Sequence, residues 1–159
     1  MMGVNQGMQP IAGYNFGAKL YGRVNKVLRL TIIYATAVTT FGFLVGMLVP
    51  DLVVGIFTSD AELTELSVTG LRITVMFFPI IGFQLVTSNF FQSIGMAGKA
   101  IFFSLTRQML ILLPCLLVLP QFFGVAGVWY SMPVSDLLAS LIALVMLVCQ
   151  FRKFRTSPL

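Results

Sequence analysis

The sequence predicts an all-α integral membrane fold with four transmembrane helices, and three observations support it. Of the 159 residues, 58% are hydrophobic and 9% are charged, whereas soluble domains carry about 25% charged residues. The mean hydropathy is +0.97. Four stretches are apolar over about 20 residues, the length that crosses a hydrocarbon layer of roughly 30 Å. They are apolar on nearly all sides, which argues against the one-sided helices of a soluble protein.

The four predicted spans cover residues 28–49, 71–94, 101–122 and 128–151. The first stops at Pro50, and the second and third are joined by a glycine-rich loop at residues 95–99. Prolines 79, 114 and 133 each fall in a different span. Membrane helices tolerate proline, and transporters use such breaks as bends that expose backbone carbonyls.

Two groups of charged residues flank the first span. Lys19, Arg23, Lys26 and Arg29 lie before it or at its start at helical spacing, so they share one face. Two interpretations stay open: an N-terminal cytoplasmic amphipathic helix on the membrane surface, or charges that only hold the connection in the cytoplasm. Between the first two spans the connection is acidic, and Ser59 or Asp60 is expected to cap a short outer helix ending near Ser67.

Charge placement predicts the orientation of the spans. Lysines and arginines occur before the first span, in the loop at 95–99 and after the last span, whereas the connection at 50–65 has acids and no bases. The positive-inside rule therefore predicts that both termini are cytoplasmic. Trp129 and Tyr130 suit an aromatic belt at the outer interface. The net charge of +5 is explained by this orientation, and no basic stripe with interleaved aromatics indicates nucleic-acid binding.

Polar side chains inside the spans are the candidates for function, because hydrocarbon cannot satisfy them. The second span holds Gln84, Ser88 and Gln92 at intervals of four residues, with Thr87 and Asn89 beside them. These groups must face other helices or a wet cavity. Interhelical hydrogen bonding and a substrate pathway both remain open interpretations.

Asp136 is the one acid within the four predicted spans. Several groups could satisfy it: Arg72, which lies at a compatible depth, the nearby hydroxyls of Ser135 and Ser140, and water at carbonyls freed by Pro133. Two interpretations of Asp136 stay open, a structural ion pair or helix-bend anchor and a carrier of protons or cations. Arg107 has a long stem that can snorkel to the interface, so we assign it no chemistry.

Several kinds of chemistry are not expected. The chain has no histidine, and its cysteines, Cys115 and Cys149, fall in apolar runs without metal-ligand spacing, as buried free thiols would. No hydrolase, zincin, P-loop or dinucleotide motif occurs. The sequence thus predicts no enzyme activity, no catalytic residue and no metal. Gly42 and Gly46 form a GxxxG pattern that permits close helix approach.

Residues 7–19 read GMQPIAGYNFGAK, and further notable stretches lie at 57–71, 90–95, 107–108 and 124–133. In sequence and in order these stretches resemble the multidrug and toxic compound extrusion (MATE) family, most closely its bacterial DinF-like and MepA-like branch. The motif positions carried over are Gln9, Pro10, Gly13, Tyr14, Asn15, Gly17 and Ala18.

The resemblance implies a twelve-helix, two-lobe transporter of the bacterial inner membrane. Residues 1–27 would be the end of a preceding helix and a basic cytoplasmic connection, and residues 28–159 four helices of the C-terminal lobe. The partners would be membrane lipid, the N-terminal lobe and preceding helices that this stretch lacks, and small organic or cationic drugs. No cofactor is implied beyond the coupling ion, Na⁺ or H⁺, and no coupling-ion residue carries over.

The implied function is secondary-active multidrug efflux by antiport, and this stretch alone is expected to be inactive. The substrate-pathway candidates are Gln84, Ser88, Asn89 and Gln92, and Asp136 is the buried acid candidate. Two alternatives remain: an exporter that flips lipid-linked oligosaccharides, and a non-transporting four-helix assembly protein that oligomerises through Gly42 and Gly46.

Overall fold

The computed structural model describes residues 2–58 and 60–156, and every regular element in those ranges is helical. The elements are α1 (Met2–Gly17), α2 (Tyr21–Leu48), α3 (Pro50–Gly55), α4 (Ala61–Val75), α5 (Phe78–Ser93), α6 (Ala97–Leu105), η1 (Thr106–Leu112), α7 (Leu113–Phe123) and α8 (Val125–Thr156). The all-α membrane fold expected from the sequence is confirmed.

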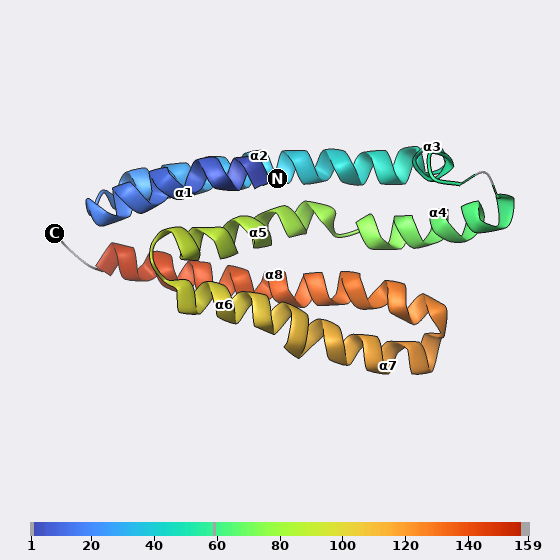
Figure 1. The fold of residues 1–159 in the computed structure, drawn as a ribbon. Helices are drawn as coiled ribbons and strands as arrows, with labels where there is room; N and C mark the ends of the chain where they lie inside the picture. The colour runs from blue at the N-terminus through green and yellow to red at the C-terminus, as the bar shows by residue number, and fades with distance from the viewer. Residues whose placement is uncertain (1, 59, 157–159) are drawn as a thin grey trace.

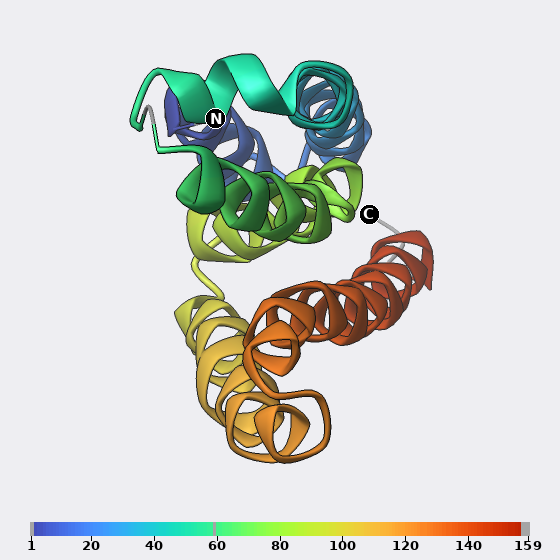
Figure 2. The ribbon, with the colours of Figure 1, turned by 90° about the vertical axis from the view of Figure 1, so that its right-hand side faces the viewer.

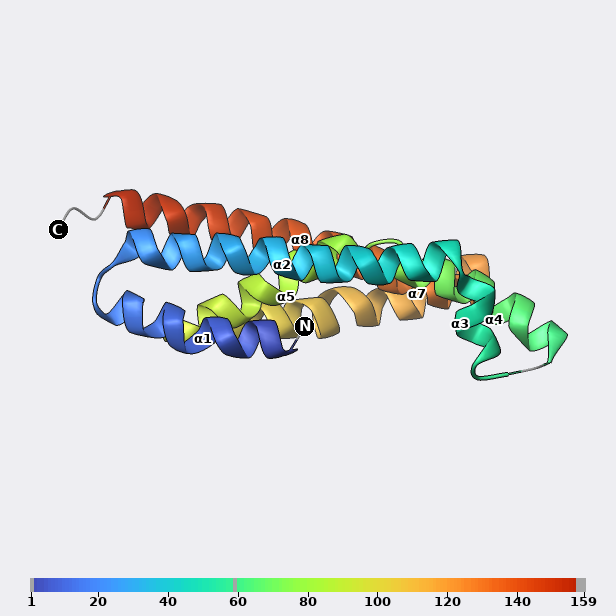
Figure 3. The ribbon, with the colours of Figure 1, turned by 90° about the horizontal axis from the view of Figure 1, so that it is seen from above.

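The helices run roughly parallel or antiparallel in three layers (Figure 1). One layer holds α1 and α2, the middle one α4 and α5, and the third the α6–η1–α7 rod with α8. The end-on view shows α4 in front of α5, between the layer that holds α2 and the layer that holds α8 (Figure 2). The view from above shows that α8 and α2 run along the same direction of the bundle (Figure 3), and α5 contacts both of them. Buried Val24, Leu28, Phe90, Phe91 and Leu147 belong to one core that joins these layers.

In the part of the chain that the structure describes, three helices are long and apolar enough to cross a membrane: Tyr21–Leu48, Ala97–Phe123 and Val125–Arg152. The pair α4 and α5 makes a fourth span only if its two helices, bent by 50° at their break, are taken together. Large apolar side chains cover the outside of these helices, and Phe41 and Val145 are 68% and 62% exposed. Lipid is the solvent in which such a surface is stable.

The basic residues before the first span do not form a separate surface helix. Residues 21–29 are the first turns of α2, which continues unbroken to Leu48. The two predicted faces are nevertheless present, since Val24 and Leu28 are buried while Arg23 and Arg29 are exposed. The continuous helix argues against the surface-helix interpretation, and the interpretation that these charges hold the connection in the cytoplasm stays a prediction.

The break in the second span lies further along the chain than predicted. Instead of ending near Ser67, the outer helix α4 continues to Val75, and α5 begins at Phe78 with Pro79 in its first turn. A proline at that position lacks only a hydrogen-bond donor that the first turn leaves unpaired. The helix start was predicted correctly, because Asp60 is the N-cap; Ser59 lies outside the described residues.

The third span contains a segment of wider helix that the sequence did not suggest. Residues Thr106–Leu112 form the π-helix η1 between α6 and α7, and Pro114 follows it in the first turn of α7. The backbone N–H of Leu113 bonds to the carbonyl of Gln108, five residues back. Such wider turns occur frequently at functional sites.

Charge separates along the bundle as the sequence predicted. The α1–α2 connection, the α5–α6 turn and the C-terminal part of α8 lie at one end, hereafter the basic end (Figure 1). Helix α3 and the start of α4, with Asp51 and Glu62, lie at the other. The first residues of α1 lie part of the way along the bundle, not at the basic end.

Gly42 and Gly46 pack inside the chain. A Cβ at Gly46 would lie 3.1 Å from Val75 of α4, and one at Gly42 would lie 3.7 Å from the Phe78 ring. These glycines therefore bring α2 against α4 and α5, and the idea that they join copies of the chain has no support. The prediction that both cysteines are buried was wrong, since Cys149 is exposed and Cys115 is partly exposed.

Candidate functional site

Amide side chains connect α1 with α5, which are distant in the sequence. Nε2 of Gln9 donates to Oδ1 of Asn89 at 3.2 Å, and Nδ2 of Asn89 donates to the carbonyl of Leu85 at 2.8 Å. One turn further along both helices, a Cβ at Gly13 would lie 2.9 Å from the carbonyl oxygen of Ser93. The backbones approach here more closely than any side chain at position 13 allows.

The remaining motif residues divide between the interior and the outside of α1. Asn15 is buried and donates through Nδ2 to the carbonyl of Ile11 at 2.8 Å, while its Oδ1 has no partner among the described residues. Tyr14 is 77% exposed. Pro10, Gly17 and Ala18 are exposed as well. Within this chain the motif thus packs α1 against α5 through Gln9 and Gly13 and presents Tyr14 outward.

The predicted row of polar residues on α5 does not keep to one face of the helix. Gln84 is buried, with 5% of its surface exposed, Ser88 is partly exposed and Gln92 is exposed. Residues four apart on an α-helix are offset by about 40°, so such a row drifts around the helix. Asn89 is partly exposed beside Ser88. The structure therefore groups Ser88, Asn89 and Gln92 on the more open side of α5 and places Gln84 in the interior.

Two hydroxyl groups of α5 donate to their own helix. Thr87 is fully buried and donates to the carbonyl of Phe83 at 2.9 Å. Ser93 donates to the carbonyl of Phe90 at 2.7 Å. These hydroxyl protons are already used, and both ends of the Asn89 amide are bonded as well. The exposed amide of Gln92 is therefore the better candidate for contact with a ligand.

Asp136 of α8 is paired with Arg107 of η1. Nη2 and Nε of Arg107 lie 2.7 Å and 2.9 Å from Oδ1 of Asp136, which is 4% exposed. Arg72, one of the candidate partners, is exposed on α4 and makes no such contact. Arg72 is not the partner because depth along a span does not fix the direction in which a side chain points. Arg107, which was expected to snorkel to the interface, instead pairs with Asp136, and the structure favours the ion-pair interpretation of Asp136.

A small cavity of about 180 Å³ adjoins this ion pair. Its lining includes Thr74 and Phe78, which flank the break between α4 and α5, and Met132 and Ser135 of α8. Drug-sized ligands need about 300–1,000 Å³, whereas a water molecule occupies about 30 Å³ of liquid. The cavity suits a few waters and is too small for a drug.

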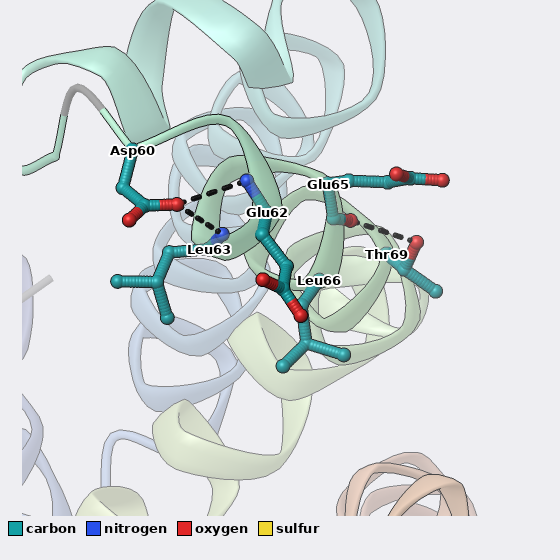
Figure 4. Close-up of a pocket in the computed structure, with 6 residues that line it drawn as sticks. All are labelled: Asp60, Glu62, Leu63, Glu65, Leu66 and Thr69. Carbon is teal, nitrogen blue, oxygen red and sulfur yellow. Dashed lines mark hydrogen bonds between the residues drawn. The ribbon is translucent and has the colours of Figure 1, made fainter.

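A larger hollow of about 550 Å³ lies at the acidic start of α4 (Figure 4). Its carboxylates belong to exposed residues, and Oδ1 of Asp60 accepts the backbone N–H groups of Glu62 and Leu63 at 2.9 Å and 3.2 Å. Thr69 donates to the carbonyl of Glu65 at 3.1 Å. These contacts are the capping hydrogen bonds of α4 and a hydrogen bond within that helix, so the polar groups of the hollow belong to the first part of α4. Within residues 2–58 and 60–156, no three His, Cys, Asp or Glu side chains gather closely enough to hold a metal.

Comparison with known proteins gives consistent matches. The family model described as MatE matches residues 1–117. The multidrug export protein MepA of Staphylococcus aureus (strain MSSA476) is 25% identical over 144 residues, which are 91% of this chain and 32% of that protein. The chain therefore spans about a third of the length of the curated relatives it matches.

Solved structures share the same arrangement of helices. A chain named "protein A" is 36% identical with a TM-score of 0.90, covering 99% of this chain and 35% of its own length. An inward-facing multidrug resistance MATE family transporter of the MOP superfamily is 18% identical with a TM-score of 0.86, over 95% of this chain and 36% of its own. Because the family model matches well over half of the residues, this chain belongs to the MatE family.

Proposed function

We propose that this chain is part of a secondary-active transporter that exports drug-like organic cations in exchange for Na⁺ or H⁺. Family membership supports transport, and the matched staphylococcal relatives are named multidrug export proteins. The coupling ion and the substrates are our proposal for this protein.

The observation that carries the proposal is the group of polar side chains on the open side of α5. Ser88, Asn89 and Gln92 keep part of their surface exposed within a membrane-spanning helix. Hydrocarbon does not satisfy amides, so this side of α5 requires a protein partner or a wet pathway. We propose that further helices of the same transporter face it across a central cavity. Amides bind cations through their carbonyl oxygens without the cost of a buried fixed charge.

We propose the orientation that the charges favour, with the basic end in the cytoplasm of a bacterial cell. The Gln9–Asn89 contact would then lie in the cytoplasmic half of the transporter, since α1 and the C-terminal half of α5 both extend to the basic end.

The test uses the complete reading frame that contains this chain, expressed in a bacterium that lacks its major efflux pumps. We expect loaded cells to release ethidium faster than cells with the empty vector. The release should slow when a protonophore collapses the proton gradient or when Na⁺ is removed, which identifies the coupling ion. A protein that is present in the membrane but exports none of a panel of cationic dyes contradicts the proposal.

Matched variants test the open side of α5. Gln92→Leu and Gln108→Leu remove the same amide from exposed positions, one on α5 and one on η1. We expect Gln92→Leu to lower ethidium efflux several-fold at equal membrane abundance and Gln108→Leu to leave it near the parent value. Equal effects of the two changes, or none from either, contradict a pathway along α5.

A further inference from the structure

Two cavities lie one after the other in the space between α2 and α8. The first, of about 380 Å³, is lined by Asn25, Leu28, Arg29, Ile32 and Ile33 of α2 and by Phe151 of α8. The second, also about 380 Å³, is lined by Thr36 of α2, Phe83 of α5 and a row of α8 residues from Leu137 to Leu144. Thr36 follows Ile32 by one helical turn, so both cavities follow the same face of α2. We call this surface, from Arg29 and Phe151 to Thr36 and Leu137, the α2–α8 furrow.

The furrow has the length of one leaflet of a bilayer. Phe151 and Leu137 are 14 residues apart on α8, which at 1.5 Å per residue is about 21 Å. Along α2, Asn25 and Thr36 are separated by about 16 Å on the same basis. Half of a hydrocarbon layer of roughly 30 Å is about 15 Å. The furrow therefore begins at the basic end and reaches about the middle of the membrane.

The chemistry of the furrow changes from one end to the other. Its inner part is lined mainly by leucine, isoleucine and phenylalanine side chains, whereas Arg29 stands exposed at the mouth. Arg29 makes no hydrogen bond or ion pair with any residue in the described part of the chain. None of the residues that line either cavity is acidic. A cation at the mouth of a long apolar surface complements a molecule with an anionic head and a hydrocarbon tail.

We propose that the α2–α8 furrow binds one anionic glycerophospholipid, with its phosphate at Arg29 and one acyl chain lying along Ile32, Thr36, Phe83 and Leu141. A soluble anion uses the arginine and leaves the apolar walls unused. A zwitterionic lipid fills the walls but carries its own cation beside the phosphate. The anionic lipid alone satisfies both ends of the furrow. It also fills the space between α2 and α8 and thereby links these two helices.

Native mass spectrometry tests this site on the purified product of the complete reading frame that contains this chain, with phosphatidylglycerol or phosphatidylcholine. We expect phosphatidylglycerol to remain bound at one copy per chain at concentrations where phosphatidylcholine does not. Arg29→Gln should weaken that binding about fivefold, since one basic residue near a membrane contributes about a factor of this size. Arg29→Lys, which keeps the charge, should retain most of the affinity.

Arg23→Gln is the matched control. It removes the same charge from the same helix, about 120° around α2 from Arg29 and outside the furrow. Thr36→Trp tests the other end, because the indole occupies the space of the acyl chain. It should weaken binding of long-chain phosphatidylglycerol more than binding of its dihexanoyl form. If Thr36→Trp does not fold, the same comparison of long and short chains on the parent protein serves in its place.

Three results would overturn the proposal. Equal losses from Arg23→Gln and Arg29→Gln show a diffuse charge effect without a site. Equal competition by glycerol phosphate and by phosphatidylglycerol shows an anion site that does not use the apolar walls. A dimer that binds no lipid shows that a second copy of the chain occupies the furrow.

Discussion

Arg107 and Asp136 connect the π-helix of the third span to the last helix through an ion pair of 2.7 Å. The neighbouring Ser135 reaches the same residue from another direction, because its hydroxyl donates to the backbone carbonyl of Arg107 at 3.4 Å. Adjacent residues of α8 thus hold both the guanidinium and the main chain of Arg107. A π-helix leaves carbonyls displaced from ordinary α-helical pairing, and α8 supplies a donor to one of them.

Replacing either member of this ion pair should destabilise the protein. Removing one partner of a fully buried pair costs about 3–5 kcal/mol. Because the Arg107 side chain is 34% exposed, we expect a smaller loss, about 2 kcal/mol, for Asp136→Asn or Arg107→Gln. Thermal unfolding in detergent, followed by circular dichroism, measures the loss.

The double variant and a matched control separate pairing from general loss of charge. Asp136→Asn with Arg107→Gln should cost less than the sum of the two single changes, since each removes the same interaction. Arg72→Gln removes an exposed arginine that has no partner in the described part of the chain, so its effect should stay within about 0.5 kcal/mol. If the loss of the double variant equals the sum of the two single losses, the interaction between Arg107 and Asp136 does not contribute to stability.

The sequence predicted the order of the spans, and also their number if the bent pair α4 and α5 is taken as one span, because each span rests on length and hydropathy, which are local properties. The separation of charge toward opposite ends followed from the same information. Sequence reasoning missed the pairing of Arg107 with Asp136. The depth expected for each residue assumed regular helices and did not tell in which direction a side chain points. A charge inside a span must find a partner, and Arg107 and Asp136 were both visible in the sequence. That requirement was the signal for pairing them.

The polar row on α5 shows a second limit of sequence reasoning. The spacing of Gln84, Ser88 and Gln92 predicted one shared face, yet Gln84 is buried whereas Gln92 is exposed. Neither the 50° bend before α5 nor the contact between Gln9 and Asn89 is encoded in the periodicity of that segment. Both depend on which helices pack together, and a single span does not contain that information.

A pair of glycine substitutions tests the contact between α2 and α5. A Cβ at Gly82 would lie 2.6 Å from Oγ1 of Thr39 and 3.0 Å from the carbonyl oxygen of Ala35. Gly82→Ala should therefore force the helices apart and destabilise the protein by about 1–3 kcal/mol, the range for overpacking. Gly22, in the first turn of α2, has nothing within 4 Å of its Cβ position.

Gly22→Ala should instead leave stability unchanged or raise it by up to about 1 kcal/mol, since alanine has the higher helix propensity. Thermal unfolding in detergent compares the two variants. If both substitutions change the stability by the same amount in the same direction, the close approach of α2 and α5 is not what excludes a side chain at Gly82.

Cysteine labelling tests the proposed orientation. In a background with Cys115→Ala and Cys149→Ala, Gly98→Cys places a thiol at the start of α6 and Glu62→Cys places one at the start of α4, both at exposed positions. A maleimide that does not cross membranes should label Glu62→Cys in intact cells and Gly98→Cys only after permeabilisation. The reverse pattern inverts the topology, and labelling of both in intact cells contradicts an arrangement with opposite ends on opposite sides.

Two buried glutamines should respond in opposite ways to the same substitution. Gln84 is 5% exposed and its Oε1 has no partner among the described residues, whereas Gln150 is 3% exposed and its Oε1 accepts a hydrogen bond from Nζ of Lys99. A buried acceptor without a partner costs about 1–3 kcal/mol, and replacing it with an apolar group removes that cost. Gln84→Leu should therefore raise the free energy of unfolding by about 1 kcal/mol.

Gln150→Leu breaks an existing contact, and the ammonium of Lys99 then keeps only its remaining neighbours, which include the Phe91 ring at 5.1 Å. Hydrogen bonds to charged groups contribute about 1.5–3 kcal/mol, so we expect a loss in that range. Thermal unfolding of both variants in the same detergent measures the difference. A loss of more than about 1 kcal/mol from Gln84→Leu means that Oε1 of Gln84 is satisfied after all, by water or by another helix of the transporter.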